Sequence, residues 1–318
     1  ISALSASDDL TAFVAEQFPH LPARSIDYAL MENADRVLNI EATFDWDDVG
    51  SWLSIAKYLE SYGDENRANE PITELSECAL LYTSGTTGRP KGCILPNAYY
   101  LDAGRWYAGL GHLCTVRPDV ERVITPLPLS HMNAMAFSTM VVLTTGGCLI
   151  QLDRFHPGSW WQSVRESRAT IVHYLGVMPA MLLGAPESAL DRQHAVRMGF
   201  GAGVSKLLHA PFEARFGFPL LEAWAMTETG SAACVMAHRE PRHVGTSCFG
   251  RPEPTIEWCL VGNDGRDVPV GEPGELLVRT AGPDPRRGFF AGYLKDDSAT
   301  EEAWAGGWFH TGDVVRAD

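Results

Sequence analysis

Hydrophobic positions gather in short runs along much of the chain, and the runs alternate with segments of helical spacing. The apolar runs predict strands at 79–82, 91–95, 123–129, 170–175, 196–200 and 219–225. Helices are expected between them at 97–110, 159–168 and 206–216, and another helix is expected to open at Pro179. Strands and helices that alternate in this way indicate an α/β domain with a largely parallel sheet.

Helix ends and the last third of the chain complete this picture. Asn97 and Ser205 are placed to cap two of the helices, and Gly217 is placed to close the second one. Beyond residue 254, strands are predicted at 255–261 and 275–280. The predicted fold class is therefore α/β, with layered, mostly parallel sheets and helices and a β-rich distal subdomain.

The overall composition is that of an ordinary globular protein with an acidic balance. Hydrophobic residues make up 45% and charged residues 20%, and the formal net charge is −15. This charge argues against nucleic acid or an anionic membrane as the partner. No apolar run approaches the length of a membrane span, and no signal peptide is expected. Seven cysteines without zinc-site spacing predict reduced thiols and a cytoplasmic protein.

A polar, glycine-rich loop follows the first predicted strand and ends at Lys91. Its glycines permit positive φ angles and close approach of a ligand. Its hydroxyls, its free N–H groups and the lysine charge suit a polyphosphate. The loop is not a Walker loop, and an ordinary Ser/Thr/Gly linker is the alternative. The candidate residues are Thr83, Ser84, Gly85, Thr86, Thr87, Gly88 and Lys91.

A second constellation lies where the predicted strand 219–225 ends. Trp224 offers a flat face for a base, Thr227 a hydroxyl for a phosphate, and Glu228 oxygens for Mg²⁺. The alternative is a core tryptophan followed by a helix cap. His131 also follows a strand, at the edge where ligands collect in α/β folds, although a lone histidine is more often structural.

The first 69 residues differ in character from the rest. Asp47 and Asp48 could hold a divalent metal, or they could form an acidic turn that caps the next helix. The strings SIDYALMENADRV and FDWDDVGSW resemble the distal catalytic domain of mannose-1-phosphate guanylyltransferases, in which the acid matching Asp48 helps bind magnesium. The glycine-rich nucleotide loop of that family is absent from 1–69, so no guanylyltransferase activity is expected. The predicted domains are this fragment with its linker (1–69) and a second region (70–318).

Residues 70–318 resemble the adenylate-forming superfamily, which includes acyl-CoA synthetases. Five strings carry the resemblance in the family's order: LLYTSGTTGRPKG, PLSH, GAG, EAWAMTETG and GWFHTGD. The resemblance implies the N-terminal core of that fold and ATP-dependent activation of a carboxylate as acyl-AMP. Trp224 stands where the family usually has tyrosine, and Ala225 replaces a glycine.

The resemblance also implies a role for each matching residue. Lys91, Thr227, Glu228 and His131 would be catalytic, with His131 bordering the acyl pocket and Glu228 binding the metal. Asp313 would bind the ribose hydroxyls. Beside the loop residues, the nucleotide would contact Gly201, Ala202, Gly203, Glu222, Ala223, Trp224, Thr227 and Asp313.

Finer similarity points to small-acid CoA ligases of the crotonobetaine/carnitine-CoA type. The expected ligands are ATP, Mg²⁺, CoA and a small carboxylic acid, with no nucleic acid and no membrane; the oligomeric state stays open. The chain ends shortly after Asp313, so we expect a ligase core truncated before the family's C-terminal lysine domain, with impaired activity. The alternatives are a sugar-1-phosphate nucleotidyltransferase fragment and a non-catalytic nucleotide-binding module.

Overall fold

The computed structural model describes residues 71–83 and 90–318. Residues 72–318 belong to one compact unit. The expected guanylyltransferase-like segment, including Asp47 and Asp48, lies outside the described residues. The same holds for the middle of the glycine-rich loop, Ser84, Gly85, Thr86, Thr87 and Gly88.

A six-stranded sheet forms the centre of the described region, in the order β4-β3-β5-β6-β7-β8. All neighbouring strands from β4 to β7 are parallel, and only β8 runs antiparallel to its neighbour. The expectation of a largely parallel sheet is confirmed. The strands are β3 (Arg122–Thr125), β4 (Cys148–Gln151), β5 (Ile171–Leu175), β6 (Met198–Ala202), β7 (Leu220–Trp224) and β8 (Val235–Met236).

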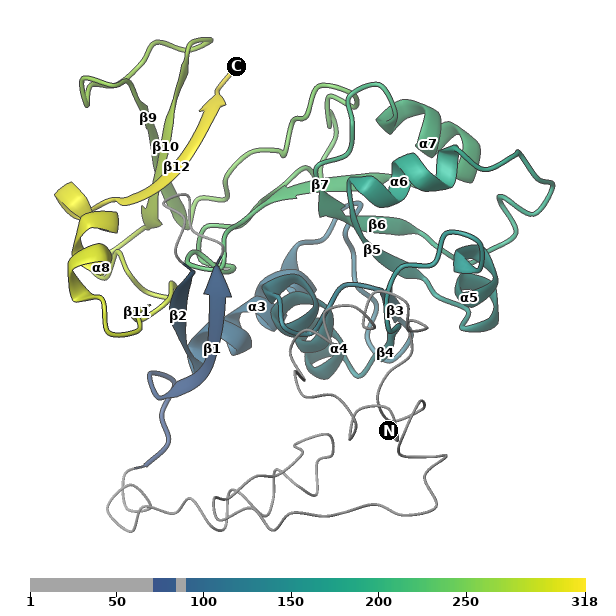
Figure 1. Cartoon of the computed structure of the whole chain (residues 1–318), viewed down its shortest axis with the longest axis horizontal. Helices are drawn as coiled ribbons and strands as arrows, with labels where there is room; N and C mark the ends of the chain where they lie inside the picture. Colours follow the sequence, from purple (N-terminus) through teal and green to yellow (C-terminus); the bar gives the residue numbers. More distant parts are fainter. Residues whose placement is uncertain (1–70, 84–89) are drawn as a thin grey trace, which may run out of the picture. The chain divides into compact units, whose positions relative to one another are not determined.

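Helices cover both faces of this sheet (Figure 1). Successive strand residues alternate between two apolar clusters, since side chains along a strand point to opposite faces. Val123 joins the cluster of α3 and α4, whereas Ile124 joins the cluster of α5, α6 and α7. The helices are α3 (Asn97–Gly109), α4 (Thr139–Thr145), α5 (Trp160–Glu166), α6 (Val177–Leu183) and α7 (His209–Phe216).

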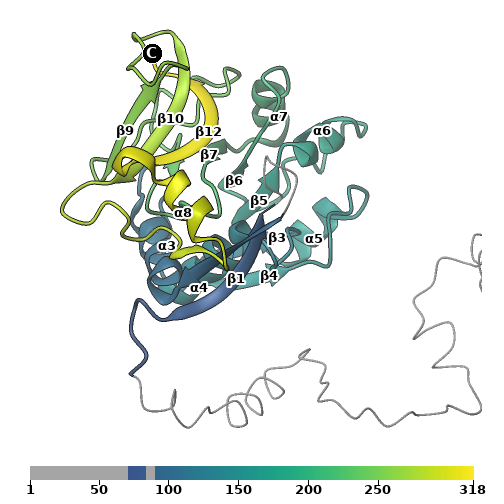
Figure 2. The same ribbon diagram turned by 60° about the vertical axis from the view of Figure 1, so that its left-hand side comes forward.

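Two smaller antiparallel sheets complete the unit. One has the order β1-β2-β11 and the other β12-β10-β9. The second confirms the expected β-rich distal subdomain, and Figure 2 shows it beside α8 (Asp297–Ala303). The strands are β1 (Glu77–Thr83), β2 (Lys91–Pro96), β9 (Ile256–Val261), β10 (Pro273–Thr280), β11 (Gly292–Tyr293) and β12 (Phe309–Arg316).

Both predicted helix caps are wrong, whereas the predicted glycine stop is confirmed. Asn97 lies inside α3, and its side-chain Nδ2 donates to the carbonyl of Thr73 at 2.9 Å. Helix α7 begins at His209, after a turn in which the Ser205 carbonyl accepts backbone hydrogen bonds. Gly217 closes α7 with a φ of 82°, a conformation that glycine adopts without strain.

Some predicted strands differ in burial or length from the observed ones. β1 is an edge strand rather than a buried one, since Tyr82 is 58% exposed and only Leu81 is fully buried. β3 ends at Thr125, because Pro126 and Pro128 have no N–H to donate to a neighbouring strand. A π-helix, η4 (Asn133–Ser138), then leads directly into α4.

The described helices include none that is both long and apolar enough to cross a membrane. All seven cysteines lie in the described region, and each is a free thiol.

Candidate functional site

The glycine-rich loop connects two antiparallel strands. Thr83 at the end of β1 is paired directly with Lys91 at the start of β2, so β1 and β2 form an antiparallel hairpin. The ammonium Nζ of Lys91 lies 4.7 Å from the centre of the Tyr293 ring, in a cation–π contact. The lysine is thereby directed from the base of the hairpin toward β11.

Glu228 is buried beside this lysine and is held by two hydrogen bonds from one short segment. The hydroxyl of Tyr293 donates to its Oε1 at 2.9 Å, and the backbone N–H of Phe290 donates to its carbonyl at 2.9 Å. Burial, followed by the charge of Glu228, raises the pKa of Tyr293 far above its ordinary value. The phenol therefore stays protonated and remains a donor at neutral pH.

Trp224 and Asp313 come from strands that belong to different sheets. The indole Nε1 of Trp224 donates to Oδ2 of Asp313 at 2.8 Å. Trp224 ends β7, whereas Asp313 lies in β12. The structure thus brings a predicted base-stacking side chain and a predicted ribose acceptor into direct contact.

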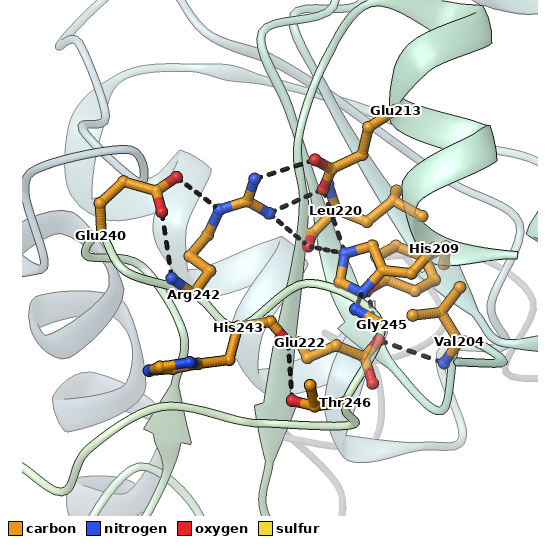
Figure 3. Close-up of polar contacts among 11 residues, drawn as sticks. Val204, His209, Glu213, Leu220, Glu222, Glu240, Arg242, His243, Gly245 and Thr246 are labelled. Carbon is orange, nitrogen blue, oxygen red and sulfur yellow. Dashed lines mark hydrogen bonds and ion pairs between the residues drawn. The ribbon is translucent and has the colours of Figure 1, made fainter. Parts of the chain in front are cut away.

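Glu222 supports the loop that follows β6. Its carboxylate accepts hydrogen bonds from the N–H groups of Gly203 and Val204, at 3.0 and 3.2 Å, and from the Tyr174 hydroxyl at 2.7 Å. Figure 3 shows the Glu222–Val204 contact. Gly203 has a φ of 79°, which favours glycine at this position. Glu222 therefore fixes the Gly201-Ala202-Gly203 loop, while its contact with a nucleotide stays a prediction.

His131 lies at an exposed position just before η4, and its backbone N–H donates to the carbonyl of Pro128. A second histidine, His173 in β5, is fully buried beneath the π-helix. Its Nδ1 lies 2.8 Å from both Asn133 Oδ1 and Ser138 Oγ, and its Nε2 lies 3.0 Å from the Tyr107 hydroxyl. Burial lowers the pKa of His173 to about 3, so the ring is neutral. His173 thus connects the segment after His131 to the sheet.

The donor set around Glu228 can be compared with what magnesium requires. Among residues 71–83 and 90–318, no cluster of three or more His, Cys, Asp or Glu side chains is arranged to hold a metal ion. Mg²⁺ bound with a nucleotide usually needs only one or two carboxylates, because water and phosphate oxygens supply the other ligands. One buried carboxylate beside Lys91 fits that pattern.

Sequence reasoning missed three residues that position the site: Tyr293, Tyr174 and His173. His173 and Tyr174 lie in the apolar strand β5, and Tyr293 lies in the two-residue strand β11, so nothing local distinguishes their polar atoms. The available signal was a polar side-chain atom in a segment expected to be buried. Such an atom almost always has a hydrogen-bond partner, so it predicts one elsewhere in the chain. The partner itself is 35 to 66 residues away along the chain in every case.

The arrangement offers an aromatic face, a ribose-type acceptor, a buried carboxylate and a lysine beside a glycine-rich hairpin. The sequence pattern of the AMP-binding enzyme family matches residues 11–294, most of the chain. The chain therefore belongs to the AMP-binding enzyme family.

Individual relatives agree with this assignment. The chain is 30% identical over 250 residues to a crotonobetaine/carnitine–CoA ligase of Citrobacter koseri, covering 78% of this chain and 47% of that protein. ATP-bound MatB from Rhodopseudomonas palustris is 25% identical with a TM-score of 0.66, over 77% of this chain and 47% of that one. The inhibitor-bound N-terminal domain of FACL13 from Mycobacterium tuberculosis is 25% identical with a TM-score of 0.66, over 83% and 63%. The chain spans about half the length of the curated relatives it matches.

The family match begins at residue 11 and so includes most of the segment expected to resemble a guanylyltransferase. The division of the chain into 1–69 and 70–318 stays a prediction. In the described region, the structure brings Lys91 close to Glu228 through Tyr293, and Trp224 to Asp313. Ala202 is the last residue of β6, and Ala223 lies in β7. Thr227 follows the end of β7 by three residues.

Proposed function

We propose that this chain binds ATP with Mg²⁺ and activates a small carboxylic acid as acyl-AMP for transfer to CoA. Membership in the AMP-binding enzyme family and the CoA-ligase relatives support the proposal. The observation that carries it is the contact between Trp224 and Asp313, two residues 89 positions apart that meet at 2.8 Å. A nucleoside has a matching arrangement, because its flat base is attached to a ribose that carries two hydroxyl donors.

The adenosine half would lie against this pair. The Trp224 ring provides a stacking face, and an aromatic residue in this place preserves the stacking expected of the family's usual tyrosine. Asp313 Oδ2 accepts the indole N–H, which leaves Oδ1 for a ribose hydroxyl. The Gly201–Gly203 loop, braced by Glu222, would border the base.

The phosphates would lie between the hairpin and Glu228. Lys91 supplies a positive charge, and the hydroxyls of Thr83, Thr227 and the loop tip supply neutral donors. Donors fixed before the reaction stabilise the negative charge that shifts onto pyrophosphate as acyl-AMP forms. Mg²⁺ held at Glu228 would neutralise part of that charge.

The acid and CoA are the further partners that we propose. His131, exposed just before η4, would border the acyl group. The reported relatives give no support to the nucleotidyltransferase alternative. A non-catalytic nucleotide-binding module is the remaining alternative. The cytoplasm is the proposed compartment, since seven free thiols suit a reducing environment.

The test begins with calorimetric titration of the chain with ATP, with and without Mg²⁺, and with a non-hydrolysable acyl-adenylate analogue. Acid-dependent ATP–pyrophosphate exchange over a panel of small carboxylic acids follows, with CoA-thioester formation measured in parallel. We expect ATP binding that strengthens with Mg²⁺, and exchange with at least one acid. Binding without any exchange would favour the non-catalytic module. A chain that binds neither ATP nor the analogue would overturn the proposal.

A further inference from the structure

Tyr293 makes three separate contacts at the candidate site, although neither the sequence nor the family comparison assigns it a role. Its hydroxyl donates to Glu228 Oε1 at 2.9 Å, and its ring lies 4.7 Å from Lys91 Nζ. Its backbone N–H donates to Thr300 Oγ1 at 2.9 Å. One side chain therefore touches both the proposed metal ligand and the proposed phosphate-binding cation.

The backbone fixes the position of Tyr293 closely. In the β11–β2 ladder Tyr293 is paired with Cys93, two residues after Lys91. The N–H groups on either side of the pair, those of Ala291 and Leu294, donate to carbonyls of the β2 segment at 2.8 Å each. A tyrosine held in this way cannot move along the strand without breaking the ladder, so its hydroxyl has a defined target.

The chemistry of the contact favours a positioning role over neutralisation. A phenol that keeps its proton gives Glu228 a hydrogen bond without cancelling its negative charge, unlike an arginine. The backbone carbonyl of Glu228 also accepts a hydrogen bond from the N–H of Phe290. Residues 290–293 therefore hold both the backbone and the side chain of Glu228. The bond occupies Oε1 and sets the direction of Oε2. On the other side, the ring face attracts Lys91.

We propose that Tyr293 is the positioning residue of the magnesium–nucleotide site: its hydroxyl directs Oε2 of Glu228 toward the metal, and its ring holds Lys91 at the phosphate loop. This inference rests on the proposed function. Loss of an outer-shell hydrogen bond to a metal ligand typically costs about 10–100-fold in metal affinity.

The experiment measures ATP affinity by calorimetry over a range of Mg²⁺ concentrations and in EDTA. Tyr293→Phe removes only the hydroxyl, and we expect about 10–100-fold more Mg²⁺ to be needed for half of the metal-dependent gain in affinity. In EDTA its ATP affinity should stay within about twofold of wild type, because the ring still holds Lys91. Tyr293→Leu removes the ring as well and should lower the EDTA affinity by a further ~2–5-fold.

Tyr100→Phe is the matched control, since it removes a hydroxyl that contacts only Met135 Sδ at 3.4 Å in the described region. It should leave the Mg²⁺ dependence unchanged. Circular dichroism melting of each variant checks the fold. In a Glu228→Gln background, Tyr293→Phe should have no further effect on the Mg²⁺ dependence, and this holds even if either change lowers stability.

Two results would overturn the inference. The first is Mg²⁺-dependent ATP binding by the wild type that Tyr293→Phe leaves unchanged. The second is an equal effect of Tyr293→Phe in the presence and absence of Glu228, which would make the hydroxyl merely structural. A wild-type chain that binds no ATP would instead overturn the proposed function, and this inference with it.

Discussion

Buried carboxylates at the two ends of the central sheet have different partners. Where the parallel strands begin, Glu121 bonds to Arg117 at 2.7 Å and to Arg197, and Thr170 donates to its other oxygen at 2.5 Å. Where the strands end, Glu222 in β7 and Glu228 just after β7 receive hydrogen bonds only from uncharged groups among the described residues. Asp313 is exposed and lies in β12 of another sheet, and its carboxylate likewise accepts a hydrogen bond from an uncharged group, the indole of Trp224.

The arginine-paired carboxylates are structural in character. Glu213 in α7 repeats the pattern, since the guanidinium of Arg242 donates hydrogen bonds to both of its carboxylate oxygens, at 2.7 and 2.9 Å (Figure 3). Burial alone raises the pKa of Glu213, but the bonds from Arg242 and His209 outweigh it and lower the pKa to about 2. Arg242 also bonds to Glu240 and so ties the segment after β8 to α7. In such a pair the positive charge of the arginine offsets the negative charge of the carboxylate. The carboxylate therefore has no uncompensated charge with which to bind a ligand.

Neutral donors have the opposite consequence. A tyrosine hydroxyl, an indole N–H or a backbone N–H orients a carboxylate but leaves its negative charge in place. The charge remains available for Mg²⁺ or for hydroxyl donors of a ligand. The partner of a buried carboxylate, arginine or neutral donor, therefore separates the framework of this molecule from its candidate site.

The largest expected effect comes from breaking the framework pair. Arg242→Ala leaves Glu213 charged, largely buried and without its main partner, and we expect a loss of about 3–5 kcal/mol in the free energy of unfolding. Urea denaturation measures it. Adding Glu213→Gln removes the orphaned charge and should recover part of the loss. A decrease below about 1 kcal/mol for the single variant would show that this pair does not hold the framework.

A smaller effect is expected from truncating the stacking face of the site. Trp224→Ala should weaken ATP binding by about 1–3 kcal/mol through lost base stacking. Calorimetry measures this, with Trp258→Ala as control, because Trp258 is a 42%-exposed tryptophan on β9 away from these contacts. Equal affinities of the Trp224 variant and the wild type would remove the stacking role.

The buried histidine predicts a pH dependence of stability. The pKa of His173 falls from 6.5 to about 3 in the folded chain because the ring is buried. Below pH 6.5 the unfolded chain binds a proton that the folded chain does not. The contribution of His173 to the unfolding free energy is therefore complete above pH 6.5. This contribution is lost as the pH falls toward 3, by about 1.4 kcal/mol per pH unit.

His173→Gln should remove this part of the slope, whereas His156→Gln, at a half-buried position with a 45%-exposed side chain, should leave the slope unchanged. Unfolding free energies from urea melts at pH 7.0, 6.0 and 5.0 provide the comparison. Parallel stability curves for wild type and His173→Gln would contradict the buried, neutral ring.

The smallest effect is expected from an exposed ion pair. Arg266 lies 3.8 Å from Asp264 with its side chain 86% exposed. Arg266→Ala should change the unfolding free energy by less than about 0.5 kcal/mol, since water screens such a pair. A larger loss would mean that exposure does not separate weak pairs from framework pairs in this molecule.

The sequence predicted the architecture better than it predicted the contacts that hold the candidate site together. Alternating apolar runs predict the parallel sheet, because that periodicity is local. The caps at Asn97 and Ser205 failed because the side chain of Asn97 bonds to Thr73, while α7 begins only at His209. Tyr293 and Glu228 are 65 positions apart, and nothing in either local sequence identifies the other. The strand pairing of β11 with β2 brings them together, and pairing of distant strands is a property of the whole fold.

We expect neutral donors to mark the ligand-binding carboxylates of this molecule and arginines to mark its framework carboxylates. Glu228→Gln and Glu213→Gln test it directly, each measured for ATP–Mg²⁺ affinity by calorimetry and for unfolding free energy by urea. We predict that Glu228→Gln loses at least about tenfold in metal-dependent affinity with little change in stability. Glu213→Gln should lose about 1–3 kcal/mol of stability and keep its affinity. If Glu213→Gln lost the affinity and Glu228→Gln kept it, the claim would be contradicted.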